Sequence, residues 1–455
     1  MHDVPYFLVN PRCGIVLRTV QKEHHPSIPS SLQTVQAHIA KMAWHYPSWQ
    51  NDIISGGSTF GDYKGAYRAA LGEAAERYCA NYLCHSQVVR ASYNDLCAEG
   101  QYALDPERMI LFSEQLYAMP GCPLAPFTRS TTTYWVPGHS LTRECQIWLP
   151  LSFVYINWYT EPYIDAPVTH TPLYAGIAAG ATFEQAILSG IEEWIERDIT
   201  MVWWLNRHPL PTVQLPLTLA QLWEGSPTTL GQRAWLIPLP NEFGIPVMAG
   251  VVENTIEQLL TIGFACRHDP IQAALKAWTE ALILQEGSRD LLDPQGAIAQ
   301  AVTDGWFADM FKPWRAARNY LDDFRDDFRD VTHLLMQQQL FLDPRAIEQV
   351  RDWVETPTTL SFDELSQCPD RTLATYRQII EARGYEIVWA DVTTPDVAAA
   401  GLRVVRVLIP GLVPNFPAAF PPLGLGRVQS LPVQLGWRED ALDEHELNYF
   451  PLPHA

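Results

Sequence analysis

The sequence predicts a mixed α/β (α+β) fold in which helices pack on several small sheets. Strand-like segments alternate with long helix-forming runs along the 455 residues. A unit of strand, glycine-rich turn and helix occurs twice, 120 residues apart, and more loosely a third time. The chain is 47% hydrophobic and 18% charged, so most of it can bury a core and disorder is excluded. At roughly 150 residues per domain, we expect two to four interleaved or consecutive units.

The first half of the chain begins with an expected hairpin and continues with two strand–turn–helix units. The turn signal Asn-Pro-Arg-Cys-Gly separates strand-like residues 5–10 from residues 14–20. A strand end and Gly-rich turn at 52–57 precede few helix breakers over 64–84, which predicts a helix. Beta-rich pieces at 131–136 and 146–149 predict strands, and residues 177–180 lead into a second helix over 183–206.

The second half repeats this order once more and then becomes irregular. Strands are expected at 246–253 and 261–266, and Pro270 opens a third helix that should extend to about residue 287. Surface helices are expected over about 300–355, followed by strands at 386–390 and 403–409. Prolines then predict an irregular tail. These patterns divide the chain into an N-terminal extension (1–50), a central unit (51–420) and a Pro-rich tail (421–455).

Charge and cysteine usage exclude several classes of protein. The formal net charge is −20, so binding to nucleic acid or an anionic membrane is not expected without a metal ion. The 8 cysteines form no CxxC pair, which argues against a structural zinc site and a disulfide scaffold. The N-terminus lacks a signal-peptide pattern and no run of 18 apolar residues occurs. We therefore expect a cytoplasmic protein with free thiols.

The repeat carries carboxylates. The segments GDYKGAYRAALGEAAERYC and TFEQAILSGIEEWIERDI share the spacing A(x6)ExxER, which places Glu73, Glu76 and Arg77 in correspondence with Glu193, Glu196 and Arg197. A looser third copy, PIQAALKAWTEALILQEGSR, keeps the seven-residue step from Ala273 to Glu280 and then offers Gln285 and Arg289 instead. A single ExxER is usually a surface ion pair, but two copies with matching faces favour a shared site.

A helical wheel predicts what surrounds these carboxylates. Small residues share their face, and an apolar stripe on each helix is expected to pack inward. The small residues are Ala66, Ala69 and Ala80 in the first copy and Ala186, Ser189 and Thr200 in the second. Small neighbours leave room for a ligand, and clustered carboxylates favour Mg²⁺ with phosphate oxygens completing its shell. Gly56, Gly57 and Ser58 offer backbone N–H groups for phosphate, although GGS is not a Walker motif.

These residues together resemble the YcaO family of ATP-dependent enzymes that activate peptide backbone amides. The resemblance rests on GGSTFGDYKGAYRAALGEAAERY, AGIAAGATFEQAILSGIEEWIERD, EALILQEGSR and DVTTPDVAAAGLRVVRVLIPGLVP, and spans roughly residues 50–455. It implies a YcaO-like fold around a central nucleotide site, with ATP and Mg²⁺ as cofactors. Its implied metal and phosphate ligands are Glu73, Glu76, Glu193 and Glu196, and its implied nucleotide contacts include Ser58, Gln285 and Arg289, while Arg77 and Arg197 would orient the glutamates.

The sequence departs from the family pattern at four places. The usual GKG is Gly56-Gly57-Ser58, the usual serine is Ala69, and the usual SNG is Tyr174-Ala175-Gly176. The tail Pro451-Leu452-Pro453-His454-Ala455 is similar to the PxPxP terminus of the azoline-forming branch, but lacks the third proline. That resemblance makes Pro451, Pro453, His454 and Ala455 catalytic candidates, with the His454 imidazole or the Ala455 carboxylate as base. Because termini are usually mobile, an exposed, flexible His454 is the favoured interpretation.

The resemblance implies a cyclodehydratase. A Cys, Ser or Thr side chain of a ribosomally made precursor peptide attacks the preceding carbonyl. Phosphorylation by ATP turns the resulting oxygen into a leaving group, and a thiazoline or oxazoline forms. An E1-like, leader-binding partner protein is expected, with an FMN-dependent azoline dehydrogenase and a homodimer left open. Two alternatives remain: a YcaO enzyme that forms thioamides or amidines, and a catalytically silent ATP-binding scaffold of a peptide-modifying complex.

Overall fold

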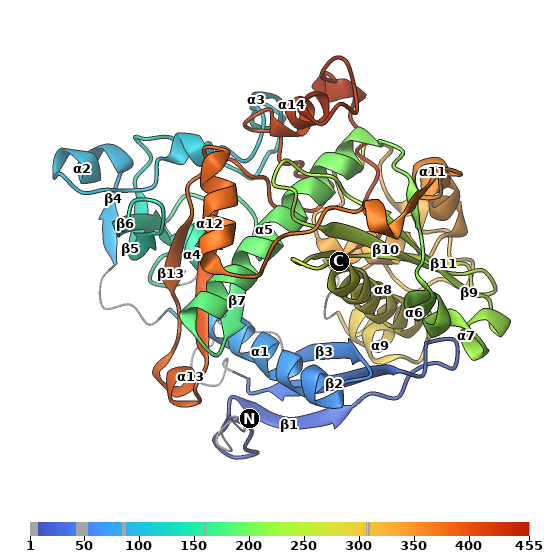
Figure 1. The fold of residues 1–455 in the computed structure, drawn as a ribbon. Coiled ribbons are helices and arrows are strands. Elements are labelled where there is room, and N and C mark those ends of the chain that lie inside the picture. Colours follow the sequence, from blue (N-terminus) through green and yellow to red (C-terminus); the bar gives the residue numbers. More distant parts are fainter. Residues whose placement is uncertain are drawn as a thin grey trace.

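The structure contains three sheets of three or more strands, with long helices packed against them (Figure 1). It is a computed structural model, and it describes residues 8–41, 53–83, 88–158, 161–305, 307 and 310–454. The mixed α/β class predicted from the sequence is confirmed. In the predicted strand–turn–helix units, the positions of the helices agree with the structure more closely than the positions of the turns.

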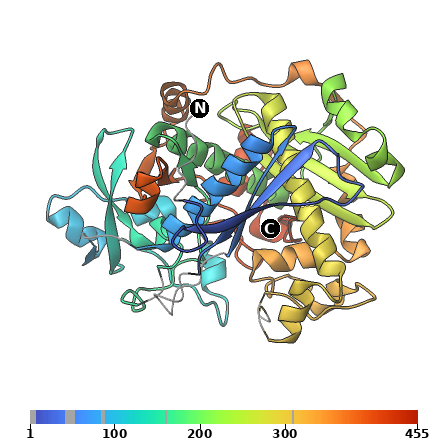
Figure 2. The same ribbon diagram turned by 90° about the horizontal axis from the view of Figure 1, so that it is seen from below.

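The N-terminal sheet has the order β1 (Val16–Gln21), β2 (Leu32–Ile39), β3 (Ile54–Phe60), and all neighbours are antiparallel. The prediction that residues 14–20 form a hairpin with residues 5–10 is wrong, because the strand at 16–21 pairs with another segment. Residues 5–7 lie outside the described part, Val9 forms only an isolated bridge to Val16, and β1 pairs with β2 instead. The sheet therefore includes residues on both sides of residue 50. Its strand β3 contacts both the helix α1 (Tyr63–Asn81) and the helix α8 (Pro270–Leu292), and Figure 2 shows the sheet from below.

The predicted Gly-rich turn before the first helix is also wrong, because Gly56, Gly57 and Ser58 lie inside β3 and pair with β2. The glycine at 57 is needed for close packing. A Cβ atom there would lie 2.2 Å from the carbonyl oxygen of Ala66 in α1 (Tyr63–Asn81). Asp62 caps α1 by accepting a hydrogen bond from the Gly65 N–H, which satisfies one free donor of the first turn.

The small residues expected beside the carboxylates pack into the core. Ala66, Ala80, Ala186 and Thr200 have no measurable exposure, whereas Ala69 is exposed. Tyr67 and Tyr78, assigned to the inward stripe of the first helix, are only half-buried. Small side chains let the helices approach strands closely. The expectation that they leave room for a ligand was therefore wrong for most of them.

The largest sheet has the order β4 (Val89–Ala91), β5 (Thr133–Ser140), β13 (Val388–Asp391), β14 (Arg403–Leu408), β7 (Ile177–Gly180). The strand β6 (Cys145–Pro150) pairs with β5 off this path. The helix α5 (Phe183–Asn206) packs against β7 and β14 and crosses the middle of the molecule, and α12 (Leu373–Ala382) packs against α5 (Figure 1). Thus α5 occupies the span predicted for the second helix.

The third sheet has the order β11 (Leu259–Cys266), β10 (Val247–Asn254), β9 (Gln232–Pro238), and α8 (Pro270–Leu292) covers it. A Cβ at Gly263 would lie 2.1 Å from the Ala277 carbonyl oxygen, so this helix too approaches its strands closely. A short parallel pair joins β8 (Thr212–Gln214) to β12 (Thr359–Ser361). Trp278, Trp203 and Trp194 are fully buried between these layers.

Shorter helices complete the described part of the chain. They are α2 (Tyr93–Ala98), α3 (Glu114–Tyr117), α4 (Leu151–Val154), α6 (Leu217–Ala220), α7 (Ser226–Thr229), α9 (Ala297–Thr303), α10 (Leu334–Leu340), α11 (Pro344–Val354), α13 (Pro395–Ala399) and α14 (Arg427–Gln434). The tail is irregular as expected, except for α14. Cysteines in the described residues carry free thiols, and Cys84 lies outside them. No described helix is long and apolar enough to cross a bilayer.

Candidate active site

The two copies of the sequence repeat make the same hydrogen bond to the backbone. In α1, the carboxylate of Glu73 accepts a hydrogen bond from the backbone N–H of Gly56, at 2.8 Å and 17 residues earlier. In α5, Glu193 accepts the same bond from Gly176, at 2.9 Å and again 17 residues earlier. Each bond ties a helix to the segment that precedes it. The 120-residue offset therefore reflects two copies of one structural unit.

The second glutamate of each pair reaches a strand of another unit. Glu76 of α1 accepts the N–H of Ala179 in β7 at 2.6 Å, and Glu196 of α5 accepts the N–H of Cys266 at the end of β11 at 3.2 Å. The first unit is thereby tied to the second, and the second to the third. These contacts bring the carboxylates of two helices into one electrostatic neighbourhood in the middle of the fold.

Burial favours the neutral form of Glu76, Glu193 and Glu196. For Glu76, burial together with the charges of Glu73 and Glu193, and against the hydrogen bond from Ala179, raises the pKa to about 7. Burial likewise raises the pKa of Glu196 to about 8, although Arg197 opposes the shift. The pKa of Glu193 is raised by the same cause. A cation entering this neighbourhood would displace protons and relieve the repulsion, so the residues fit a divalent ion.

The carboxylates do not by themselves form a closed metal cage. Within the described residues, no three His, Cys, Asp or Glu side chains are placed to hold an ion together. Mg²⁺ usually takes one or two carboxylates and completes its octahedral shell with water and substrate phosphates. The arrangement therefore fits Mg²⁺ that arrives with a phosphorylated ligand, and fits poorly a metal held by protein alone.

The third helix contributes charged groups that the sequence analysis did not assign. Lys276 Nζ lies 3.0 Å from Glu280 in α8. Although burial opposes ionisation, Lys276, Arg197 and His454 lower the pKa of Glu280 to about 2. Arg267 and Glu280 both act electrostatically on Glu196, so these groups face the same neighbourhood. The seven-residue step from Ala273 to Glu280 was the signal that could have identified Glu280.

Gln285 and Arg289 lie further along α8, in a second cluster. The Arg289 guanidinium binds Glu257 with two nitrogens, at 3.0 and 2.7 Å, and also donates to Glu286, Gln285 and Ser27. Its side chain is 12% exposed, so a nucleotide would have to replace one of these partners. Gln285 accepts a bond from Gln232, and its buried Nε2 has no partner among the described residues, so this amide can donate to a ligand.

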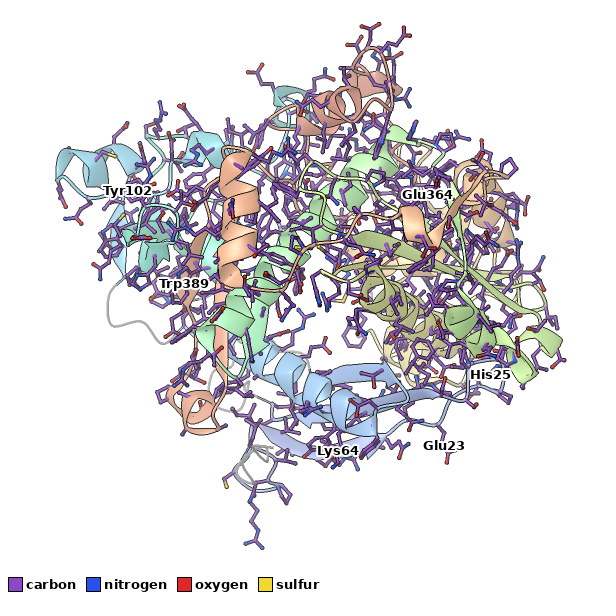
Figure 3. The ribbon with its side chains drawn as sticks, in the orientation of Figure 1. Glu23, His25, Lys64, Tyr102, Glu364 and Trp389 are labelled. Carbon is purple, nitrogen blue, oxygen red and sulfur yellow. The ribbon has the colours of Figure 1, made fainter. Side chains whose placement is uncertain are left out.

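This second cluster meets the link between β1 and β2. His24 Nδ1 lies 3.4 Å from Glu286, and His25 of the same link is on the side of the molecule where the third sheet lies (Figure 3). Ser58, expected to contact the nucleotide, lies in β3 with its hydroxyl 2.7 Å from that of Thr34. Because the Gly56 N–H is bonded to Glu73, the predicted phosphate-binding role of this backbone is wrong at that position.

Two arginines hold a carboxylate and a loop of the site in place. Arg77 lies 3.6 Å from Glu73 and stacks over the Tyr174 ring at 5.1 Å. Arg406 is fully buried and donates to the carbonyl oxygens of Val154, Leu173, Tyr174 and Ala175, at 2.6 to 3.1 Å. Arg406 thereby holds the loop that presents the Gly176 N–H to Glu193. No pattern in the sequence singled out this arginine.

The tail ends beside the second pair of glutamates. His454 is 4% exposed, so its favoured interpretation as a flexible, exposed histidine was wrong. Its Nε2 lies 2.7 Å from Arg197 Nη1, and Arg197 Nη2 lies 3.4 Å from Glu196. Burial, assisted by the charge of Arg197, lowers the pKa of His454 to about 4. Pro451 and Pro453 are buried with it, and Ala455 lies outside the described residues.

Residues 60–413 match the family of YcaO cyclodehydratases, which is described as binding ATP and Mg²⁺. The chain belongs to the YcaO family. The resemblance seen in the repeated helices is thereby confirmed, and ATP and Mg²⁺ are the cofactors of this family. In this YcaO chain the matched region contains α1, α5 and α8, and it begins at Phe60, the last residue of β3.

Solved structures agree with this membership. A heterocyclase in complex with substrate and cofactor is similar over 98% of this YcaO chain and 56% of its own, with 24% identity and a TM-score of 0.68. The heterocyclase TruD matches over 86% and 51%, with 26% identity and a TM-score of 0.59. A YcaO from Methanopyrus kandleri, bound with AMPPCP and Mg²⁺, matches over 88% and 90%, at 19% identity and a TM-score of 0.55. The chain thus spans about half the length of the two heterocyclases.

Proposed function

We propose that this YcaO protein is an ATP-dependent cyclodehydratase. Its substrate would be a ribosomally synthesised precursor peptide in which Cys, Ser or Thr is converted to thiazoline or oxazoline. The observation that carries the proposal is the bond from the Ala179 N–H of β7 to Glu76 of α1, which joins the two acidic units, with Glu73 and Glu193 both acting electrostatically on Glu76. Membership of the YcaO family and similarity to two heterocyclases support the reaction class.

Each charged residue then has a proposed task. Glu73, Glu76, Glu193 and Glu196 would hold Mg²⁺, and Arg77 and Arg197 would orient them. Lys276 and Arg267 would face the negative charge of the nucleotide from α8 and the end of β11, while Ser58, Gln285 and Arg289 would contact it at the second cluster. Magnesium-bound ATP supplies the phosphoryl group that makes the peptide oxygen a leaving group. The protein positions the reactants and neutralises phosphoryl charge.

The tail contains the two candidates for the base that transfers the proton, His454 and Ala455. His454 Nε2 already accepts a hydrogen bond from Arg197, and its lowered pKa, about 4, makes the imidazole a weak base at neutral pH. We therefore propose that His454 positions groups and does not transfer the proton. The chain carboxylate at Ala455 is the other candidate of the sequence analysis. Pro451 and Pro453 would set the course of the tail.

The test uses the full chain with a Cys/Ser/Thr-rich precursor peptide and the leader-binding protein encoded beside it. Mass spectrometry should show the loss of about one water per ring, with ADP release matching the number of rings. Glu193→Gln should abolish both signals. Its matched control is Glu348→Gln in α11, where the side chain is 69% exposed. An unmodified peptide with normal ADP release would contradict cyclodehydration.

The same precursor peptide and leader-binding protein distinguish cyclodehydration from two alternative functions. A thioamide- or amidine-forming enzyme would use the same nucleotide site with an external nucleophile, so the mass change would differ from the loss of water. Truncation of residues 451–455 should disable azoline formation, whereas a thioamide- or amidine-forming enzyme should keep its activity at saturating Mg²⁺. A silent scaffold would bind ATP but release no ADP when peptide and partner are added.

The partners follow from the proposed reaction. A precursor peptide and an E1-like, leader-binding protein are proposed as obligatory, and an FMN-dependent azoline dehydrogenase would act on the product. The catalytic unit would comprise residues 51–420. The similar heterocyclase structure, which contains a substrate and a cofactor, supports binding of a substrate together with a cofactor by this fold.

A further inference from the structure

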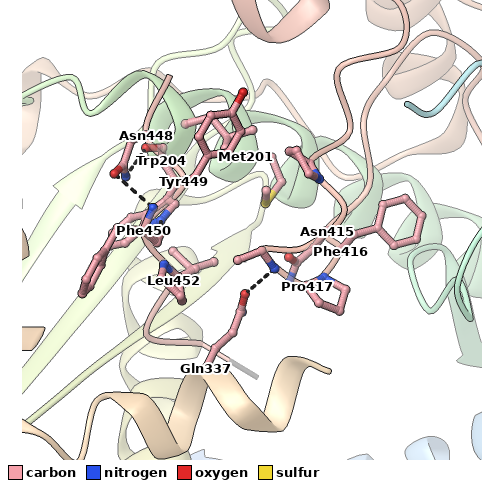
Figure 4. Close-up of a pocket in the computed structure, with 14 residues that line it drawn as sticks. Met201, Trp204, Gln337, Asn415, Phe416, Pro417, Asn448, Tyr449, Phe450 and Leu452 are labelled. Atoms are coloured by element: carbon pink, nitrogen blue, oxygen red, sulfur yellow. Dashed lines mark hydrogen bonds between the residues drawn. The ribbon is translucent and has the colours of Figure 1, made fainter. Parts of the chain in front are cut away.

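The last described residues of the tail are built into the fold. The Phe450 carbonyl accepts a hydrogen bond from Trp204 Nε1 of α5 at 2.7 Å, and the Pro453 carbonyl accepts one from the Ile262 N–H of β11 at 3.1 Å. Gln337 of α10 donates to the His454 carbonyl at 3.1 Å. Phe450, Leu452, Gln337 and Trp204 line one small pocket where these elements meet (Figure 4). The tail is thus fixed on three sides before it reaches the glutamates.

Both nitrogens of the His454 ring are used. Nδ1 lies 3.1 Å from the Ile262 carbonyl oxygen, which can only accept, so Nδ1 carries the proton. Nε2 is then the acceptor, and Arg197 Nη1 donates to it at 2.7 Å. The ring also meets Phe264 edge to face, with centroids 5.3 Å apart. These contacts fix the tautomer and the orientation of the imidazole.

Arg197 is consequently held at a distance from its own carboxylates. Its Nη2 lies 3.9 Å from Glu193 and 3.4 Å from Glu196, longer than the 2.7 to 2.9 Å usual for a charge-assisted hydrogen bond. Other arginines of this protein close fully on carboxylates. Arg371 binds Glu192 with two bonds of 2.9 Å, and Arg289 binds Glu257 at 3.0 and 2.7 Å. At Arg197, the imidazole occupies Nη1, one of the nitrogens that could close on a carboxylate. The matching Arg77, which faces the Tyr174 ring, also stays 3.6 Å from Glu73.

We propose that His454 is a positioning residue that keeps Arg197 from pairing fully with Glu193 and Glu196, and so leaves these carboxylates available to the Mg²⁺ of the nucleotide. A guanidinium and a metal ion compete for the same carboxylate lone pairs, so withdrawing the guanidinium favours the metal. The tail then acts on metal binding through Arg197, besides any role in peptide chemistry. This inference rests on the proposed function, because it takes the glutamates as Mg²⁺ ligands.

The test measures binding, without peptide or turnover. Calorimetry of the full chain with a non-hydrolysable ATP analogue, at a series of Mg²⁺ concentrations, reports how much Mg²⁺ is needed for half-maximal binding. His454→Leu should raise this concentration by about tenfold, as loss of a residue behind a metal ligand usually does. His454→Gln keeps an acceptor and a donor and should stay within about twofold of the native chain.

A matched control separates the imidazole from the docking of the tail. Trp204→Phe removes the donor to the Phe450 carbonyl but leaves the bond between His454 and Arg197 intact. It should bind Mg²⁺ and analogue as the native chain does. If His454→Leu does not fold by thermal unfolding, His454→Asn replaces it, because its shorter amide cannot span Ile262 and Arg197, and the same loss is expected.

Three results would overturn the inference. They are native Mg²⁺ dependence in His454→Leu or His454→Asn, an equal loss in His454→Gln, and an equal loss in Trp204→Phe. Failure of the native chain itself to bind the analogue with Mg²⁺ would be a different result, since it would remove the proposed function and this inference with it. The native titration is therefore read first.

Discussion

The two acidic helices carry the same motif in different surroundings. In α1, the Glu73 side chain is 34% exposed, and Arg77 stacks on the Tyr174 ring. In α5, the Glu196 side chain is 7% exposed, and Arg197 is bonded to a residue of the tail. The half at α5 is the more covered one, because Glu193 is 27% exposed against 34% for its counterpart Glu73, and Glu196 is buried whereas Glu76 is half-buried. A shared motif therefore fixes the backbone contacts of the glutamates, while distant segments set how readily each one ionises.

The largest effect is expected when a buried carboxylate of the covered half becomes an amide. Glu196→Gln should lower kcat/KM for ring formation by at least about 100-fold, because the amide can no longer neutralise or bind the cation. The Tm should not fall, since the amide oxygen can still accept the Cys266 N–H and a buried carboxyl with a raised pKa gains little from its charge. The assay is the peptide mass shift with time.

Glu73→Gln makes that comparison sharper. The Glu73 carboxylate is more exposed than those of Glu193 and Glu196. We therefore expect a smaller loss of kcat/KM in Glu73→Gln than in Glu196→Gln. Equal losses at the two positions would show that exposure does not distinguish the two halves. Full activity of Glu196→Gln would remove this residue from the metal site.

The next effect is on pH dependence. Glu76 and Glu196, with pKa values raised to about 7 and about 8, hold protons at pH 6 and must release them to bind a cation. Affinity for Mg²⁺ and nucleotide should therefore rise between pH 6 and pH 8.5, by up to about tenfold per pH unit for each proton displaced. The stability of the metal-free protein should change in the opposite sense. It should fall from about pH 4.5, where these carboxyls ionise in the unfolded chain, up to about pH 7 to 8, where they also ionise in the folded chain.

Calorimetry of analogue binding across this range checks the prediction. Glu196→Gln should remove the part of the pH dependence near pH 8 and leave the part near pH 7 that belongs to the other half. A flat profile in the native chain would contradict the raised pKa values of both carboxyls.

The smallest expected effect concerns the caps of the same two helices. Asp62 accepts the Gly65 N–H at the start of α1, and Thr182 accepts the Gln185 N–H at the start of α5. Asp62→Ala and Thr182→Ala should each lower the free energy of unfolding by about 1 kcal/mol, with Thr182→Ser as the conservative control. Denaturant unfolding measures this. A loss of nucleotide affinity at unchanged stability would show that a cap belongs to the site.

Much of the helical framework was predictable because its signals are local. The residues 183–206 predicted as a helix are those of α5, and Asp269 with Pro270 marks the start of α8. The end of α8 was placed too early, because Gly287 continues the helix to Leu292. The Gly56–Gly57 pair was interpreted as a turn, although Gly57 serves the approach of α1 to β3. The strand β2 was missed, so the partner of β1 was assigned wrongly.

The site was predictable only where the repeat marked it. The glutamates at 73, 76, 193 and 196 follow from the matched spacing, and the structure brings them together. Lys276 lies in the third copy of the repeat and Arg406 in a segment that carries the resemblance, but no pattern there assigned either residue a role. Arg267 belongs to no recognised motif. All three join the site through the packing of distant strands and helices. The bond between His454 and Arg197 joins residues 257 positions apart. A contact between residues so far apart leaves no periodic pattern in the sequence.

The clamp formed by Arg406 has a consequence for how this protein can evolve. Its guanidinium holds the loop before Gly176 through carbonyl oxygens, which every amino acid possesses. Mutations that change the side chains at 173–175 leave those oxygens in place, so the clamp itself sets no limit on residue type there. The limits come from packing, because Leu173 and Ala175 are buried and Tyr174 faces Arg77. If related proteins carry other residues at 173–175, the buried Arg406 is a better marker of common descent than the side chains of this loop.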